Sequence, residues 1–134
     1  MGLTHLLDTN ACVAVIRQRS PRVLTRLQHM TPGSVGVSII TVSELQFGAA
    51  KSLNPQRNRA ALEQFLLPLE ILDYGSAAAF CYGDIRARLE KSGTPIGPLD
   101  TLIAAHAKSL NAVMVTNNLS EFRRVTGLKV EDWT

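Results

Sequence analysis

Three acidic residues lie where one structural element is expected to give way to the next. Asp8 follows the apolar segment 3–7, Glu44 lies in the helical segment 41–52, and Asp100 precedes the apolar run "TLIAAHA". No lysine or arginine lies within one helical turn of any of them. Carboxylates near a core face need a partner, and clustered carboxylates repel one another unless a cation joins them. Hard oxygen ligands select Mg²⁺ or Mn²⁺ rather than zinc, so the three acids predict a divalent metal site.

Each acid also has a purely structural interpretation. Asp8 can cap a helix that begins near residue 11. Glu44 has the capping-box spacing from Thr41, and the dipole of its helix favours Asp100 by roughly 0.3–1 kcal/mol. Against these interpretations, Glu44 and Asp100 both lie beside the apolar stripe that should face the sheet. The metal-site hypothesis therefore requires that all three acids meet in space.

The segments that must position these acids alternate between strand and helix. Strands are expected at 3–7, 35–39, 71–74 and 112–116, with a last short strand within 128–133. Helices are expected at 11–19, from Ser20-Pro21 through 30, and at 41–52, 56–70, 76–93 and 99–111. Strands separated by helices of this length form a parallel sheet covered on both faces. The acids and the polar run 116–118 should share the sheet edge where such folds bind ligands.

Composition limits the class of protein. The 134 residues fit one domain with a real core, and the net charge of +3 permits an anionic partner without requiring one. The two cysteines show no metal-ligand spacing, so both are expected to be buried, reduced thiols. No apolar run approaches the ~20 residues of a membrane span, which makes a cytoplasmic protein without a membrane partner the expectation.

Four motifs, taken in order, resemble those of a known family. "LLDTN", "TVSELQFGA", "GTPIGPLDTLIAAHA" and "VTNNLSEF" are similar to the successive motifs of the PIN-domain ribonucleases, most closely to VapC, the toxin of bacterial VapBC toxin–antitoxin pairs. The resemblance runs from the first strand to "VEDW". It implies a single PIN domain over 1–134, an α/β/α sandwich with a central, mostly parallel sheet, and a metal-dependent endoribonuclease. It also implies inhibition by a VapB antitoxin.

The resemblance assigns site residues by position. Asp8, Glu44 and Asp100 would bind Mg²⁺, or Mn²⁺ in its place. Many PIN domains have a fourth aspartate after the last strand, where this chain has asparagines, so Glu121 becomes the candidate fourth catalytic acid. The polar neighbours expected to orient the carboxylates or contact substrate are Thr9, Asn10, Thr116, Asn117 and Asn118.

The expected reaction is hydrolysis by a metal-activated water, which leaves a 5′-phosphate and a 3′-hydroxyl. Phosphate contacts are expected from Arg86, Arg88 and Arg123. Aromatic residues make up only 5% of the chain, which favours a folded RNA such as tRNA over stacked single strands. The resemblance further implies a homodimer within a larger toxin–antitoxin complex that reaches DNA only through the antitoxin. The run "AALEQFLLPLE" is either core or part of an antitoxin groove.

Four other interpretations stay open. A metal-free ribonuclease would use His5, His29 or His106, but no spacing pairs them. An aspartyl phosphatase needs a second acid where Asn10 stands. A non-catalytic PIN-like domain would lack a core acid, and all three are present. A PIN nuclease of general RNA processing differs from a toxin by having no antitoxin gene beside it.

Overall fold

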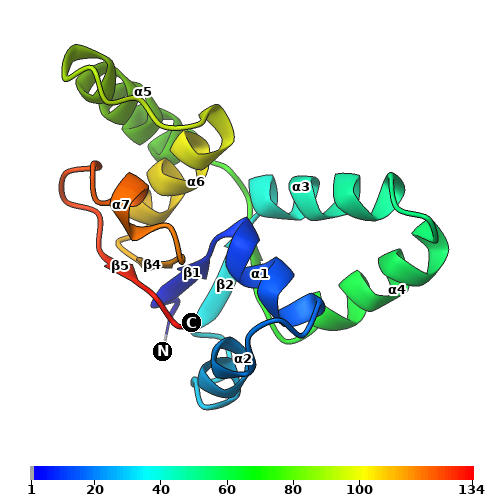
Figure 1. Ribbon diagram of the computed structural model, residues 1–134. Coiled ribbons are helices and arrows are strands. Elements are labelled where there is room, and N and C mark those ends of the chain that lie inside the picture. Colours follow the sequence, from blue (N-terminus) through cyan, green and yellow to red (C-terminus); the bar gives the residue numbers. More distant parts are fainter. Residues whose placement is uncertain (1) are drawn as a thin grey trace.

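The computed structural model describes residues 2–134 and contains a five-stranded parallel sheet with helices on both faces (Figure 1). Its strands are β1 (His5–Leu7), β2 (Val35–Ser38), β3 (Glu70–Leu72), β4 (Val113–Val115) and β5 (Val130–Glu131). Its helices are α1 (Thr9–Ile16), α2 (Pro21–Gln28), α3 (Ile39–Ala50), α4 (Pro55–Leu66), α5 (Ser76–Lys91), α6 (Pro98–Ser109) and α7 (Leu119–Phe122). The strand order is β3-β2-β1-β4-β5. The expected α/β/α sandwich is confirmed, and its sheet is parallel throughout.

Two apolar cores form because successive strand residues point to opposite faces of the sheet. Leu6 and Met114 pack with α5, α6 and the segment after α7, whereas Leu7 and Val115 pack with α1 to α4. In Figure 1 the α3–α4 pair projects from one side of the sheet and the α5–α6 pair from the other. The sheet, whose central strand β1 buries Leu6 and Leu7 completely, therefore separates two helical layers.

Several expected boundaries differ from the structure. The second strand ends at Ser38, and α3 begins at Ile39 with the Ser38 hydroxyl as its cap, so Thr41 is not the cap that we expected. The capping-box role of Glu44 is therefore wrong, because Glu44 lies too far into the helix. The first helix starts at Thr9 and ends at Ile16, whereas Ser20 and Pro21 open α2 as predicted.

One glycine is required by close packing of the sheet. A Cβ atom on Gly36 of β2 would lie 2.6 Å from Leu72 Cδ2 and 2.7 Å from the Glu70 carbonyl oxygen. Both neighbours belong to β3, so only glycine lets these strands pair in the observed register.

Both cysteines are free thiols, but only Cys12 is buried, so the expectation of two buried thiols is wrong for Cys81.

No helix within residues 2–134 combines the length and the hydropathy that crossing a bilayer requires.

Candidate active site

The carboxylate of Asp8 lies at the carboxyl end of the central strand. It is 3% exposed, and its Oδ1 accepts a hydrogen bond of 2.7 Å from the backbone N–H of Ala11. Asp8 is thus the N-cap of α1, as its structural interpretation supposed. The Thr116 hydroxyl, which follows the neighbouring strand β4, donates a second hydrogen bond to it. Burial raises the pKa of Asp8, these two bonds oppose the rise, and nearby Glu44 adds to it. Asp8 can therefore cap α1 and also take part in the site.

Glu44 reaches the same place from α3. The Thr9 hydroxyl donates a 2.6 Å hydrogen bond to Glu44 Oε1, and the same hydroxyl lies 3.4 Å from Thr41 Oγ1, which is fully buried. This chain of side chains joins the first turn of α1 to α3 and fixes the Glu44 carboxylate. Thr9 was expected in such an orienting role, whereas sequence reasoning placed Thr41 only at a helix cap.

Asp100 and Glu121 form the other half of the site. Burial first, then the neighbouring Glu121, raises the pKa of Asp100 to about 6, and Asp8 and Glu44 add to the rise. A protonated Asp100 also donates a hydrogen bond to Glu121. Because all three other carboxylates act on Asp100, the four acids that the sequence singled out lie together at one edge of the sheet.

Glu121 is held in place by two further contacts. Its Oε2 accepts a 2.6 Å bond from Asn118 Nδ2, and its Oε1 accepts a 3.3 Å bond from the backbone N–H of Gly97. Sequence reasoning did not identify Gly97. The only sequence signal for it is its place immediately before Pro98 at the start of α6, which leaves an amide N–H without a helical partner.

In the part of the chain that the structure describes, these acids have no cationic partner. Within residues 2–134, none of the four carboxylates forms an ion pair with a lysine, arginine or histidine. In the same part of the chain, no three histidine, cysteine or acidic side chains lie close enough together to hold one metal ion between them. Mg²⁺ is commonly bound through one or two carboxylates and keeps several waters. The oxygen donors therefore fit Mg²⁺ or Mn²⁺ bound directly by some acids and through water by the others.

The three histidines are engaged separately. His5 Nε2 lies 3.2 Å from Glu131 Oε1, and His29 Nδ1 lies 2.7 Å from the Thr25 carbonyl oxygen. His106 is buried, and its Nδ1 shares a 2.7 Å hydrogen bond with the Ser38 hydroxyl. The last bond ties α6, which carries Asp100, to the start of α3, which carries Glu44. Burial lowers the pKa of His106 and keeps it neutral at pH 7.

The arginines expected to bind RNA are exposed, but two of them have partners. Arg86 Nε lies 2.8 Å from Glu90 Oε2 and Arg88 Nε lies 3.4 Å from Asp84 Oδ2, in helical i,i+4 pairs. Arg123 forms no ion pair within residues 2–134. The RNA contacts expected of these three arginines stay predictions. The two remaining polar residues, Asn10 and Asn117, are exposed and line a groove beside the acids.

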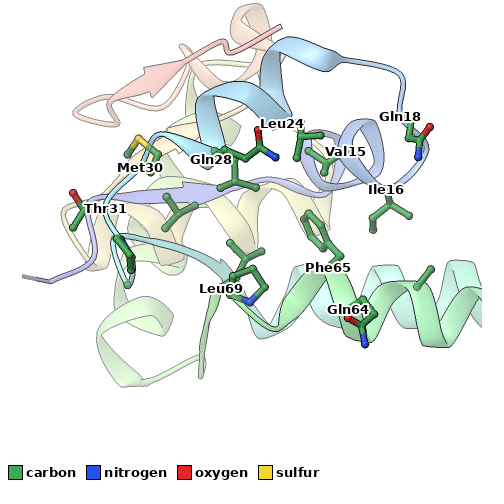
Figure 2. Close-up of a pocket in the computed structure, with 16 residues that line it drawn as sticks. Val15, Ile16, Gln18, Leu24, Gln28, Met30, Thr31, Gln64, Phe65 and Leu69 are labelled. Carbon is green, nitrogen blue, oxygen red and sulfur yellow. The ribbon is translucent and has the colours of Figure 1, made fainter.

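A second groove, lined mainly by apolar side chains, lies between α1, α2 and α4 and has a volume of about 570 Å³. Figure 2 shows Leu24 of α2 and Phe65 of α4 on opposite sides of this space, with Val15 of α1 between them. The run "AALEQFLLPLE" contributes both to the core and to this groove. Leu62 is buried in the core, whereas Phe65 and Leu69 line the groove.

The family described as "PIN domain" matches residues 5–128. The chain is 46% identical to "tRNA(fMet)-specific endonuclease VapC" of Salmonella typhimurium, with 98% of each chain covered, and 47% identical to "Ribonuclease VapC2" of Haemophilus influenzae, again with 98% of each covered. Two solved structures are similar to it. The DNA-bound VapBC of Salmonella typhimurium gives a TM-score of 0.94 at 45% identity, covering 98% of this chain and 99% of that one. VapBC2 of Rickettsia felis, bound to a DNA fragment from its promoter, gives a TM-score of 0.93 at 38% identity, covering 98% of this chain and 100% of that one.

Proposed function

This chain belongs to the PIN-domain family and, within it, to the VapC ribonucleases, and on that premise we propose that it hydrolyses tRNA(fMet) as the toxin of a toxin–antitoxin pair. The substrate is suggested by two relatives, at 46% and 44% identity, that are named as tRNA(fMet)-specific endonucleases. The proposal places the enzyme in the cytoplasm, where its substrate is found.

The observation that carries the proposal is a group of four carboxylates without a cation. Burial first, and then the neighbouring carboxylates, raise the pKa of Asp100 to about 6, and a bound divalent ion would favour the ionised form of all four acids. Asp8, Glu44 and Asp100 would hold Mg²⁺ or Mn²⁺, some of them directly and the others through bound water, and Glu121 would complete the site. The ion would lower the pKa of a bound water and neutralise charge on the phosphate.

The protein's own groups prepare this site. The Thr9 and Thr116 hydroxyls hold Glu44 and Asp8 through bonds that a carboxylate accepts only in fixed orientations. Asn118 and the Gly97 N–H hold Glu121 in the same way. These contacts fix the orientation of three of the four acids.

The direct test uses purified protein and a tRNA(fMet) transcript, with Mg²⁺ or with EDTA. Cleavage is expected only with Mg²⁺ or Mn²⁺, leaving a 5′-phosphate and a 3′-hydroxyl at the mapped ends. Asp8→Asn should fold, because asparagine caps helices as well as aspartate does, but it should not cleave. Glu63→Gln, an exposed acid on α4 that forms no ion pair within residues 2–134, is the matched control. Activity in EDTA with 2′,3′-cyclic ends would contradict the metal-dependent mechanism and direct attention to His106.

The groove between α1, α2 and α4 suits the antitoxin. Its walls carry Val15, Leu24, Phe65 and Leu69, and burying such side chains gives about 25 cal/mol per Å² of apolar surface. We propose that an apolar segment of a VapB antitoxin occupies it, as relatives solved as VapBC complexes suggest. The chain would then be a homodimer within a larger complex and would reach operator DNA only through the antitoxin. A gene for such an antitoxin beside this one separates a toxin from a nuclease of general RNA processing.

A further inference from the structure

A groove lined by both polar and apolar side chains begins beside the acidic site and has a volume of about 500 Å³. Asn10 and Asn117 line it next to the acids, because Asn10 lies two residues after Asp8 and Asn117 follows Thr116, which bonds Asp8. Arg19 and Arg22 line it as well. They follow the eight residues of α1, a length of about 12 Å at 1.5 Å per residue. The groove thus runs from Asn10 and Asn117, which are close in the chain to Asp8 and Thr116, to two arginines.

Both arginines are available to a ligand. They are exposed, and in the part of the chain that the structure describes neither forms an ion pair. The backbone before them is fixed, because Gln18 adopts a left-handed conformation (φ 54°) and the Arg19 N–H donates a 2.8 Å bond to the Ala14 carbonyl. This is the Schellman closure of a helix end. It turns the chain back along α1 and places Arg19 at the groove.

The chemistry of the groove matches an RNA strand. Four carboxylates repel a polyanion, so a substrate needs positive charge beside them to reach the site. The planar guanidinium binds phosphate oxygens in pairs, and asparagine amides both donate and accept hydrogen bonds. The volume lies within the 300–1,000 Å³ range of sites that hold a small ligand, which is the scale of a nucleotide.

We propose that this groove holds the nucleotides next to the scissile bond. Arg19 and Arg22 bind backbone phosphates one or two nucleotides from the acids, and Asn10 and Asn117 contact the nucleotide between them. The inference rests on the proposed nuclease function and adds the substrate path to it.

Two features near this groove differ from it in their chemistry or their contacts. A cavity on the other side of α1 includes Glu44, Arg17 and Arg57, but most of its other walls are apolar side chains of α1, α3 and α4, which suit a protein better than a phosphate backbone. The carboxylate of Asp132 lies beside Thr134 of the groove. It accepts a 2.8 Å bond from the Thr134 N–H and a further bond from the Thr134 hydroxyl, and it pairs with neither arginine.

The test compares Arg19→Ala/Arg22→Ala with Arg59→Ala, an exposed arginine of α4 outside the groove. Cleavage of a tRNA(fMet) transcript is measured with Mg²⁺. Each lost phosphate contact is expected to raise KM about tenfold at low salt, with kcat changed less than threefold. Binding of the same RNA is measured in an Asp100→Asn background from 50 to 200 mM KCl. The slope of log Kd against log salt should fall by about 0.7 for each arginine removed.

Arg19→Lys/Arg22→Lys should keep the wild-type salt slope while losing part of the affinity, because lysine retains the charge but not the paired bonds. If the double alanine variant does not fold, the two single variants decide. A KM and salt slope equal to those of Arg59→Ala would overturn the inference. So would unchanged cleavage with weakened inhibition by the antitoxin, since the groove would then bind protein. If the wild type itself fails to cleave, the proposed function fails instead, and RNA binding in the Asp100→Asn background still tests the groove.

Discussion

Replacing Asp100 with asparagine is expected to stabilise the protein at neutral pH, although Asp100 is a proposed metal ligand. The Asp100 carboxyl has a folded-state pKa of about 6 against an ordinary value of 3.8, because of burial and of the carboxylates of Glu121, Asp8 and Glu44. Asparagine has nearly the same shape and carries no charge. It therefore removes the repulsion while keeping the packing at the start of α6.

The magnitude follows from the difference in pKa. Ionising Asp100 in the folded protein costs at most about 3 kcal/mol at neutral pH, and solvent screening at this half-buried side chain reduces that to about 1–2 kcal/mol. Asparagine loses the favourable interaction of a charge with the helix N-terminus, roughly 0.3–1 kcal/mol. The net gain is about 1 kcal/mol, which corresponds to a Tm increase of about 3–5 °C for a domain of this size.

The sign of the pH dependence distinguishes this explanation from a packing effect. Because the folded-state pKa of Asp100 is raised, the folded protein holds this proton more tightly than the unfolded chain does. The stabilisation from that proton is complete below about pH 4 and is lost as the pH rises through about 6. The advantage of Asp100→Asn over the wild type should therefore be absent near pH 4 and full at pH 7.5.

The assay is thermal unfolding of wild type, Asp100→Asn and the control Glu63→Gln at pH 4, 6 and 7.5 in EDTA, repeated with 5 to 10 mM Mg²⁺ (on the order of concentrations that saturate weak carboxylate sites). Mg²⁺ should raise the Tm of the wild type at pH 7.5 and raise that of Asp100→Asn less. The reasoning is refuted if Asp100→Asn melts at or below the wild-type temperature at pH 7.5, or if its gain is equally large at pH 4.

Three further predictions concern separate parts of the molecule. Thr9→Val removes the 2.6 Å bond to Glu44 and should lower kcat about tenfold with a Tm change of no more than a few degrees; an unchanged kcat would show that this bond does not orient the acid. Leu24→Glu, in the apolar groove and 39% exposed, should weaken antitoxin binding at least tenfold by calorimetry while cleavage of RNA stays at the wild-type rate. Gly36→Ala places a methyl group 2.6 Å from Leu72 Cδ2 and should destabilise the protein by about 2 kcal/mol or more in urea unfolding; a loss below about 0.5 kcal/mol would mean that β3 shifts freely.

Much of the fold could be predicted from local patterns. Ser20-Pro21 opens α2 as expected because a cap and a proline act within a single helical turn. The start of α3 was predicted wrongly because Ser38 and Thr41 are both good caps. The structure uses Ser38, whose hydroxyl also bonds His106, 68 residues later in the chain. A contact of that separation has no local signal.

In the candidate site, too, some features have a local signal in the sequence and others depend on contacts between distant segments. Asp8, Glu44 and Asp100 stand out in the sequence because each is an acid beside an apolar segment with no lysine or arginine within one helical turn. Glu121 was assigned by resemblance alone, and only the folded chain brings it to Asp100. Which exposed cations share a groove was equally hidden, since Arg19 and Arg22 look like any other exposed arginines until the turn at Gln18 directs them along α1.

By itself, the sequence determined the kinds of elements, their order and the acids at their ends, because periodicity, caps and turns depend on residues a few positions apart. Only the tertiary structure decided which acids interact, which hydroxyls hold them and which cations face the same groove. Those relations depend on how α1, α3 and α6 pack on the sheet, and packing is set by the whole buried surface rather than by any one segment.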